Sequence, residues 1–97
     1  FDNAVSLDAA RAKGIVSEVA GRADILVAPD LEAANMIAKQ LVYLADAEMA
    51  GVVLGARVPI MLTSRADNDR ARLASSALAQ LYGYWRREGR AYKGARR

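Results

Sequence analysis

The stretch Val58-Pro59-Ile60-Met61-Leu62-Thr63-Ser64-Arg65-Ala66-Asp67 places polar side chains directly after a short apolar run. The apolar part predicts a buried strand, and Pro59 lies near its start, where a missing backbone donor does least harm. Open α/β sheets bind ligands at the carboxyl ends of their strands. The hydroxyl of Ser64, the guanidinium of Arg65 and the carboxylate of Asp67 are therefore the first candidate site.

A similar arrangement lies upstream of this stretch. Residues 24–28 form an apolar run that Pro29 closes, which predicts another strand buried on both faces. Asp30 can then cap a helix over residues 31–49, whose apolar side chains recur at helical spacing. Gly51 ends that helix.

Three further elements complete the pattern. A short helix with a serine cap is predicted over residues 6–13, and residues 52–54 form one more strand. Either Asp67 or Asn68 can cap the final helix, which Gly89 ends. The apolar side chains of this helix recur at intervals of three and four and form one stripe, consisting of Leu73, Ala74, Ala77, Leu78, Leu81, Tyr82 and Trp85.

The order helix, strand, helix, strand, strand, helix predicts an α/β protein with a parallel or mixed sheet. With only about three strands the sheet is incomplete, so we predict a partial three-layer α/β/α unit cut from a larger protein. A chain of 97 residues has room for one compact unit at most. The helix over residues 31–49 is apolar on much of its circumference, so we expect cover from further segments or from a partner subunit.

The composition excludes several kinds of chemistry. There is no Cys and no His, which rules out disulfides, metal sites built from those side chains and acid–base catalysis by His. Any catalytic base must be a carboxylate, a Lys or a Tyr. Since no apolar run approaches the roughly 18–20 residues that span a bilayer, and no signal-peptide pattern opens the chain, we expect a cytoplasmic protein.

The net charge of +3 is concentrated at the end of the chain. Residues 1–88 form the expected α/β portion, and residues 89–97 form a basic tail that we expect to be flexible. Without residues 86–97 the chain is slightly acidic. The tail, with aromatic side chains nearby, allows nonspecific nucleic-acid binding. Short basic tails are usually solvated, so this interpretation is the minor one.

Four groups of motifs keep an order and spacing typical of one family: residues 1–6, 13–21, 23–35 and 55–67. Over roughly residues 1–82 they resemble the C-terminal segment of the phosphate acetyl/butyryltransferases. The similarity is greatest to the butyryltransferase-like branch, which includes bifunctional proteins that join this domain to an enoyl-CoA hydratase-like one.

This resemblance implies an acyltransferase that moves an acyl group between coenzyme A and inorganic phosphate, without metal or redox cofactor. It implies a two-domain fold similar to that of isocitrate and isopropylmalate dehydrogenases, an active site in the cleft between domains, and a homodimer. The chain would supply the C-terminal part of one domain and would be inactive alone. A second implied possibility is a regulatory module that binds acyl-CoA without transferring it, as in some malic enzymes.

The resemblance also assigns roles to the strand-end residues. In the family, the Ser-Arg pair that Ser64 and Arg65 match lines the active site, with the Ser at the reacting thiol and the Arg at the phosphate. The alternative for Arg65 is an ion pair with Asp67 or Asp69, and for Ser64 a cap on the following turn. The Asp that follows the pair in the acetyltransferase branch falls on Ala71 here, so that assignment fails.

Asp67 is then the candidate base, with a helix cap as its alternative role. Upstream, Asp30 and Asn35 match a family Pro-Asp motif and the Asn that follows it, and would line the cleft; Asp30 is otherwise the cap of its helix. Asp2 and Asn3 match a family Asp-Asn pair with a similar role, or are otherwise turn residues before the first helix.

Overall fold

The computed structural model describes residues 1–89, and the basic tail from residue 90 onward lies outside the described residues. The chain divides into two compact units, Phe1–Lys39 and a second that begins at Gln40, where the length suggested one. Among the described residues, Ala10 is the one fully buried apolar side chain.

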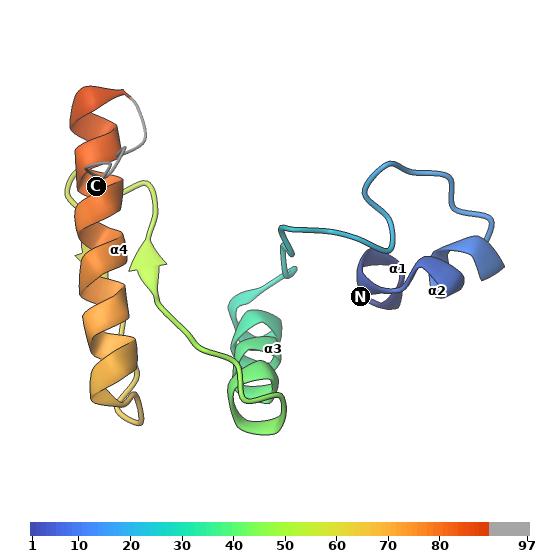
Figure 1. Cartoon of the computed structure of the whole chain (residues 1–97), viewed down its shortest axis with the longest axis horizontal. Coiled ribbons are helices and arrows are strands. Elements are labelled where there is room, and N and C mark those ends of the chain that lie inside the picture. The colour runs from blue at the N-terminus through green and yellow to red at the C-terminus, as the bar shows by residue number, and fades with distance from the viewer. Residues whose placement is uncertain (90–97) are drawn as a thin grey trace, which may run out of the picture. The chain divides into compact units, whose positions relative to one another are not determined.

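Two short helices begin the first unit, α1 (Asp2–Val5) and α2 (Leu7–Ala12), and they pack against each other (Figure 1). Ser6 caps α2, because its Oγ accepts the N–H of Ala9 at 3.3 Å. After α2 the backbone of Gly14 turns into the left-handed region. The predicted helix over residues 6–13 is thus confirmed together with its cap, whereas α1 was not predicted.

Gly21 anchors the segment that follows α2. Its N–H donates to the carbonyl oxygen of Asn3 at 2.7 Å, and the N–H of Ala23 donates to the carbonyl of Ala4 at 3.0 Å. A Cβ at Gly21 would lie 2.5 Å from Cα of Leu7, and φ is 81°. Both the close approach and the positive φ require glycine at this position.

The predicted strand over residues 24–28 is wrong, because this segment has no regular secondary structure. Ile25 and Val27 are 81% and 89% exposed. A strand needs a neighbour to satisfy its N–H and C=O groups, and no described residue pairs with this run. An apolar run shows only that a segment favours burial, and not that a partner strand is present.

Helix α3 (Leu31–Leu44) begins where the sequence predicts and ends earlier than residue 49. Asp46 has a φ of 52°, a left-handed conformation that Asp tolerates better than most residues. The carbonyl of Leu41 accepts the N–H groups of both Ala45 and Ala47, which closes the helix end. No residue of α3 is buried, consistent with a helix whose apolar surface needs cover.

The second unit contains a two-stranded sheet, β1 (Val52–Val53) and β2 (Ile60–Met61), with α4 (Asp69–Glu88) packed beside it (Figure 1). The strands are antiparallel, with Val52 opposite Met61 and Val53 opposite Ile60. Both predicted strands exist, but the expected parallel or mixed sheet of three does not. The connection over residues 54–59 suits an antiparallel hairpin, since a parallel pair needs a crossover of a dozen or more residues.

Small residues hold α4 against the hairpin. Ser75, which is 1% exposed, accepts the N–H of Gly51 at 3.0 Å through its Oγ and donates to the carbonyl of Ala71 at 2.8 Å. The carbonyl of Gly51 in turn accepts the N–H of Leu62 at 2.8 Å. A Cβ on the buried Gly83 would lie 2.8 Å from Cγ of Pro59. Serine and glycine thus let the helix approach β2 closely, just before the chain enters the candidate site.

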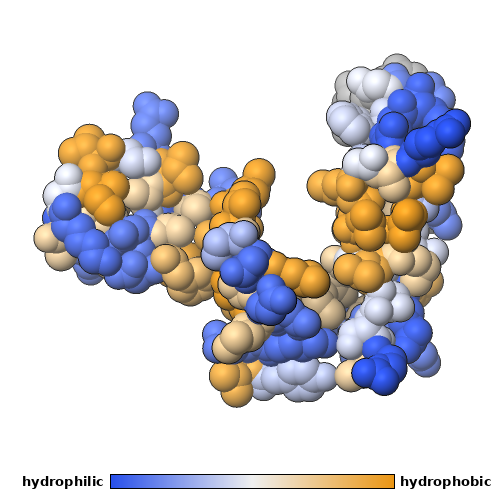
Figure 2. All heavy atoms as spheres, turned by 180° about the vertical axis from the view of Figure 1, so that it is seen from behind, coloured by the Kyte–Doolittle hydropathy of each residue, from blue (hydrophilic) through white to orange (hydrophobic). Residues whose placement is uncertain are grey.

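The apolar stripe predicted on α4 is largely exposed rather than buried in the second unit. Leu73 is 73% exposed and Trp85 51% exposed. Trp85 stacks on Tyr82 with ring centroids 5.9 Å apart. Hydrophobic side chains also reach the surface in patches in Figure 2. The buried side of α4 carries Ser75 and Gly83, so hydrophobic periodicity marked a different face from the one that contacts the hairpin.

Among residues 1–89, no helix has both the length and the apolar character needed to cross a membrane.

Candidate functional site

The site residues nearest β2 form a hydrogen-bonded turn between that strand and α4. The N–H of Ser64 donates to Oδ2 of Asp67 at 2.7 Å, and the N–H of Asp67 donates to the carbonyl of Ser64 at 3.1 Å. The Oγ of Ser64 accepts the N–H of Ala66 at 3.4 Å. We call residues 64–67 the strand-end turn. Its closure brings Ser64, Arg65 and Asp67 together at the carboxyl end of β2, as the sequence predicted.

Asp67 closes this turn and does not cap α4. The cap is Asn68, whose Oδ1 accepts the N–H of Ala71 at 2.8 Å. The sequence allowed either Asp67 or Asn68 as the cap of α4, and in the structure the cap is Asn68. One carboxylate oxygen of Asp67 is used by the N–H of Ser64, and within residues 1–89 its Oδ1 has no hydrogen bond. That oxygen is available to accept a proton.

Arg65 occupies the second position of the turn and is exposed. It forms no hydrogen bond or ion pair within residues 1–89, so the alternative pairing with Asp67 or Asp69 does not occur there. A guanidinium without a protein partner can grip an incoming oxyanion with two parallel hydrogen bonds. The turn therefore presents a cation and a hydroxyl on adjacent residues.

Asp2 and Asn3 lie in α1 in the first unit, rather than in a turn before the first helix. Oδ2 of Asp2 accepts a hydrogen bond from Nζ of Lys13 at 2.6 Å, and its Oδ1 accepts the N–H of Asn3 at 2.8 Å. These two bonds, led by the one from Lys13, lower the pKa of the Asp2 carboxyl below its ordinary value of 3.8. The side-chain oxygen of Asn3 is buried and has no hydrogen-bond partner in the described part of the chain.

Asp30 and Asn35 also belong to the first unit. Asp30 precedes α3, and its Oδ1 accepts the N–H of Ala33 at 2.7 Å, so its role as a helix cap is confirmed. Asn35 is exposed on α3 and makes no side-chain hydrogen bond within the described part of the chain. The structure thus distributes the predicted site residues over both units. Hydrogen bonds join Ser64 to Asp67 and Asp2 to Asn3, and Arg65 lies in the turn that Ser64 and Asp67 close.

The described residues hold no group of three or more acidic side chains that suits a metal ion, and the sequence offers no Cys or His for one. A groove in the second unit runs between β2 and α4, lined mainly by Pro59, Met61, Ala77, Leu81, Tyr84 and Arg87. None of the strand-end residues lines it. Its apolar lining belongs to the uncovered surface of α4.

Sequence reasoning missed two residues that support the turn. Arg72 on α4 donates through Nε to the carbonyl of Asp67 at 3.2 Å and through Nη2 to the carbonyl of Ser64 at 3.4 Å. Arg72 lies outside the apolar stripe predicted on this helix, so hydrophobic periodicity gives it no role. Ser75 ties Gly51 to α4 and was assigned no role. The sequence offers one signal for Arg72. It follows the cap at Asn68 by four residues, which places both residues on the same side of the first turn of α4.

Comparison with known proteins places the chain in a family. The family model described as "Phosphate acetyl/butaryl transferase" matches residues 1–80. A phosphate acetyltransferase of Rhizobium meliloti is 66% identical over 87 residues, which are 90% of this chain and 28% of that protein. A phosphate acetyltransferase of Thermotoga maritima is 53% identical over 82 residues, 84% of this chain and 28% of that protein.

A phosphate butyryltransferase of Clostridium beijerinckii is 46% identical over 81 residues, 84% of this chain and 27% of that protein. These matches extend over the strand-end turn and most of α4. The chain belongs to the phosphate acetyl/butyryltransferase family, and the expected resemblance to this family is confirmed. Its identity to the two acetyltransferases is higher than to this butyryltransferase, although the motifs suggested greater similarity to the butyryltransferase-like branch. The chain spans little more than a quarter of the length of these curated relatives.

Proposed function

We propose that this chain contributes the strand-end part of an active site that transfers an acyl group between coenzyme A and inorganic phosphate. The observation that carries the proposal is the closed turn at residues 64–67, which presents Ser64 and Arg65 together at the end of β2, with no ion pair to Arg65 within residues 1–89. Membership in a family of acyl-CoA:phosphate acyltransferases supplies the reaction.

The reaction requires three kinds of help. A thiol with an ordinary pKa near about 8.5 loses its proton, the attacked carbonyl is polarised, and phosphate is held as it enters or leaves. Arg65 holds the phosphate, since guanidinium binds its oxygens in a bidentate manner. Ser64 hydrogen-bonds the reacting thiol end. Oδ1 of Asp67, which has no hydrogen bond within residues 1–89, accepts the thiol proton when acyl-CoA forms and returns it to the leaving thiolate in the reverse direction, while Oδ2 keeps the turn closed.

The other predicted site residues are assigned a less specific role. Asp2, Asn3, Asp30 and Asn35 line the same substrate cleft in the assembled protein. That protein has the three-layer α/β/α architecture of the isocitrate and isopropylmalate dehydrogenases and forms a homodimer. No metal or redox cofactor takes part. The large exposed apolar surfaces of α3 and α4 support this larger assembly, because side chains of that kind are covered in stable proteins (Figure 2).

A chimeric enzyme tests the function directly. The matched segment of the Rhizobium meliloti phosphate acetyltransferase is replaced by the corresponding residues of this chain. We expect the chimera to release thiol from acetyl-CoA only when phosphate is added, at a rate within about tenfold of the parent enzyme. Acetyl-, propionyl- and butyryl-CoA are compared in the same assay.

Two controls complete this test. The parent enzyme, expressed in parallel, reports the activity of the unaltered site. The isolated 97-residue chain is expected to show little or no turnover, because Arg65 then lacks the facing part of the cleft. A folded chimera that binds coenzyme A without turnover would contradict the proposal and favour a regulatory module.

A further inference from the structure

Arg72 connects the first turn of α4 to the strand-end turn. Its side chain lies across the backbone, with Nε 3.2 Å from the carbonyl oxygen of Asp67 and Nη2 3.4 Å from that of Ser64. The two accepting residues are the first and last of the turn. The planar guanidinium of Arg72 therefore bonds both ends of the turn that presents Arg65.

The backbone carbonyl of Ser64 accepts two hydrogen bonds in this arrangement. It accepts both the N–H of Asp67 and the guanidinium of Arg72. The carbonyl of Asp67 accepts Nε of the same guanidinium, and the Asp67 carboxylate closes the turn from its other side. Only an arginine has donors spaced to reach both carbonyls at once, since a lysine ammonium is a compact point charge.

Arg72 is itself fixed by the helix that carries it. Its backbone N–H donates to the carbonyl of Asn68 at 3.1 Å, and Asn68 is the residue that caps α4. Farther along α4, Ser75 holds the helix to Gly51 and so to the end of β2. The strand and the helix on either side of the turn are therefore tied to each other, and Arg72 bonds the turn to the helix.

We propose that Arg72 is a positioning residue for the phosphate-binding guanidinium of Arg65, an inference that rests on the function proposed above. Arg72 does not touch substrate. It fixes the backbone of the turn, so that the side chains of Arg65 and Ser64 keep one orientation relative to each other. Since displacement of a binding group by about 1 Å can cost on the order of a hundredfold in rate, loss of the two backbone bonds reduces catalysis without removing any reacting group.

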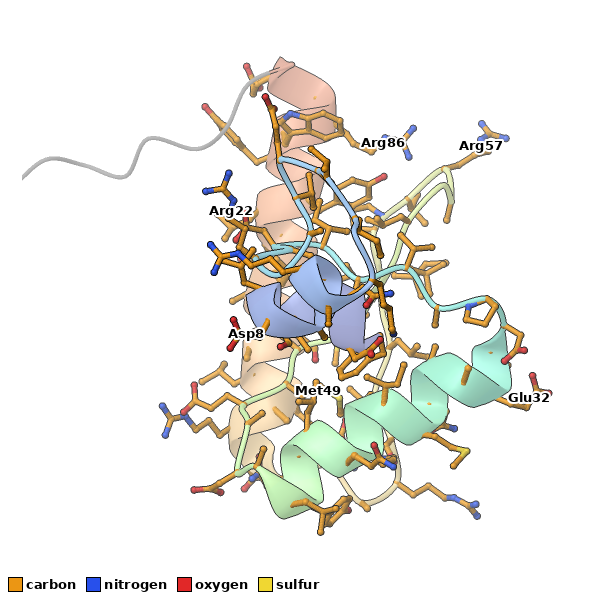
Figure 3. The ribbon with its side chains drawn as sticks, turned by 90° about the vertical axis from the view of Figure 1, so that its right-hand side faces the viewer. Asp8, Arg22, Glu32, Met49, Arg57 and Arg86 are labelled. Atoms are coloured by element: carbon orange, nitrogen blue, oxygen red, sulfur yellow. The ribbon has the colours of Figure 1, made fainter. Side chains whose placement is uncertain are left out.

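The test uses the chimeric enzyme with Arg72→Ala, Arg72→Lys and, as matched control, Arg57→Ala. Arg57 is exposed in the hairpin connection and, within residues 1–89, forms no hydrogen bond or ion pair with the turn (Figure 3). We expect Arg72→Ala to lower kcat/KM for phosphate by about tenfold or more, with KM for acetyl-CoA within about twofold. Arg72→Lys is intermediate, and added guanidinium salt at low concentration partly restores the alanine variant.

Hydrogen exchange provides a readout that does not need activity. In Arg72→Ala we expect faster amide exchange in the peptide that covers the strand-end turn, with no change in Arg57→Ala. Unchanged exchange, or wild-type phosphate kinetics in a folded Arg72→Ala protein, would overturn the positioning role. An inactive unmodified chimera would instead contradict the proposed function, and the exchange comparison would still decide whether Arg72 holds the turn.

Discussion

Ser64 and Asp67 close the strand-end turn reciprocally, each donating its backbone N–H to an oxygen of the other. The N–H of Ser64 reaches Oδ2 of Asp67 at 2.7 Å, and the N–H of Asp67 reaches the carbonyl of Ser64 at 3.1 Å. The carboxylate of Asp67 reaches back to a backbone N–H three residues earlier, as the acidic residue of a capping box does, whereas the N–H of Asp67 bonds the backbone carbonyl of Ser64 and not its hydroxyl. The turn lies just ahead of α4, whose own cap is Asn68.

Replacing Asp67 by Asn separates its two proposed roles. The amide oxygen can still accept the N–H of Ser64, so the turn stays closed, but the amide cannot take up a proton. We expect kcat of the chimera to fall by about 10²-fold or more, the range typical of general-base loss, while exchange at the turn is unchanged. Asp67→Ala, which loses both functions, should also show faster exchange. Wild-type turnover in Asp67→Asn would exclude Asp67 as the base and would leave it only the role of closing the turn.

Arg65→Ala should weaken the use of phosphate. A hydrogen bond to a charged group contributes about 1.5–3 kcal/mol, so we expect KM for phosphate to rise roughly 10- to 100-fold. KM for acetyl-CoA should change little. Arg65→Lys should recover only part of the effect, because lysine keeps the charge but not the bidentate geometry. Initial rates at varied phosphate provide the measurement, and an equal defect in Arg57→Ala would argue against the assignment.

Gly83→Ala should destabilise the protein, although alanine normally favours a helix by about 1 kcal/mol over glycine. The added Cβ would lie 2.8 Å from Cγ of Pro59, so the helix or the hairpin must shift. We expect a net loss of about 1–3 kcal/mol in the chimera, as for other overpacked contacts. Thermal unfolding measures it. The double variant with Pro59→Ala removes the clash and should regain stability, whereas additive losses would contradict this explanation.

The ion pair of Asp2 with Lys13 should be visible by NMR titration. We expect the Asp2 carboxyl to titrate below its ordinary pKa of 3.8, and Lys13→Gln to raise that pKa again. Because the folded-state pKa is lowered, the stabilisation is present above the unfolded-state pKa and is lost as pH falls through the folded value. The difference in the free energy of unfolding between the unmodified protein and the Lys13→Gln variant should therefore disappear in strongly acidic solution. A titration unaffected by Lys13→Gln would exclude the contact.

Local signals in the sequence predicted the structure well, and signals that depend on distant partners did not. Caps and stops at Ser6, Asn68 and Gly89 act within a few residues, and the structure confirms them. Residues 24–28 failed as a strand because strand formation needs a neighbour that no local pattern reveals.

The candidate site shows the same limit. The sequence brought Ser64, Arg65 and Asp67 together because they are adjacent in the chain. It missed Arg72, whose contacts depend on how α4 follows the turn. The apolar stripe also gave no indication that Ser75 holds α4 to Gly51, since a small polar residue carries no hydrophobic signal.

The hairpin connection over residues 54–59 has a practical consequence for spectroscopy. Arg57 points outward from this connection in Figure 3 and forms no hydrogen bond or ion pair within residues 1–89. Because the 97 residues contain no cysteine, Arg57→Cys would create a single thiol in the chain. A fluorophore or spin label attached there would report on the surroundings of the hairpin in the assembled protein and would leave the residues of the strand-end turn unmodified.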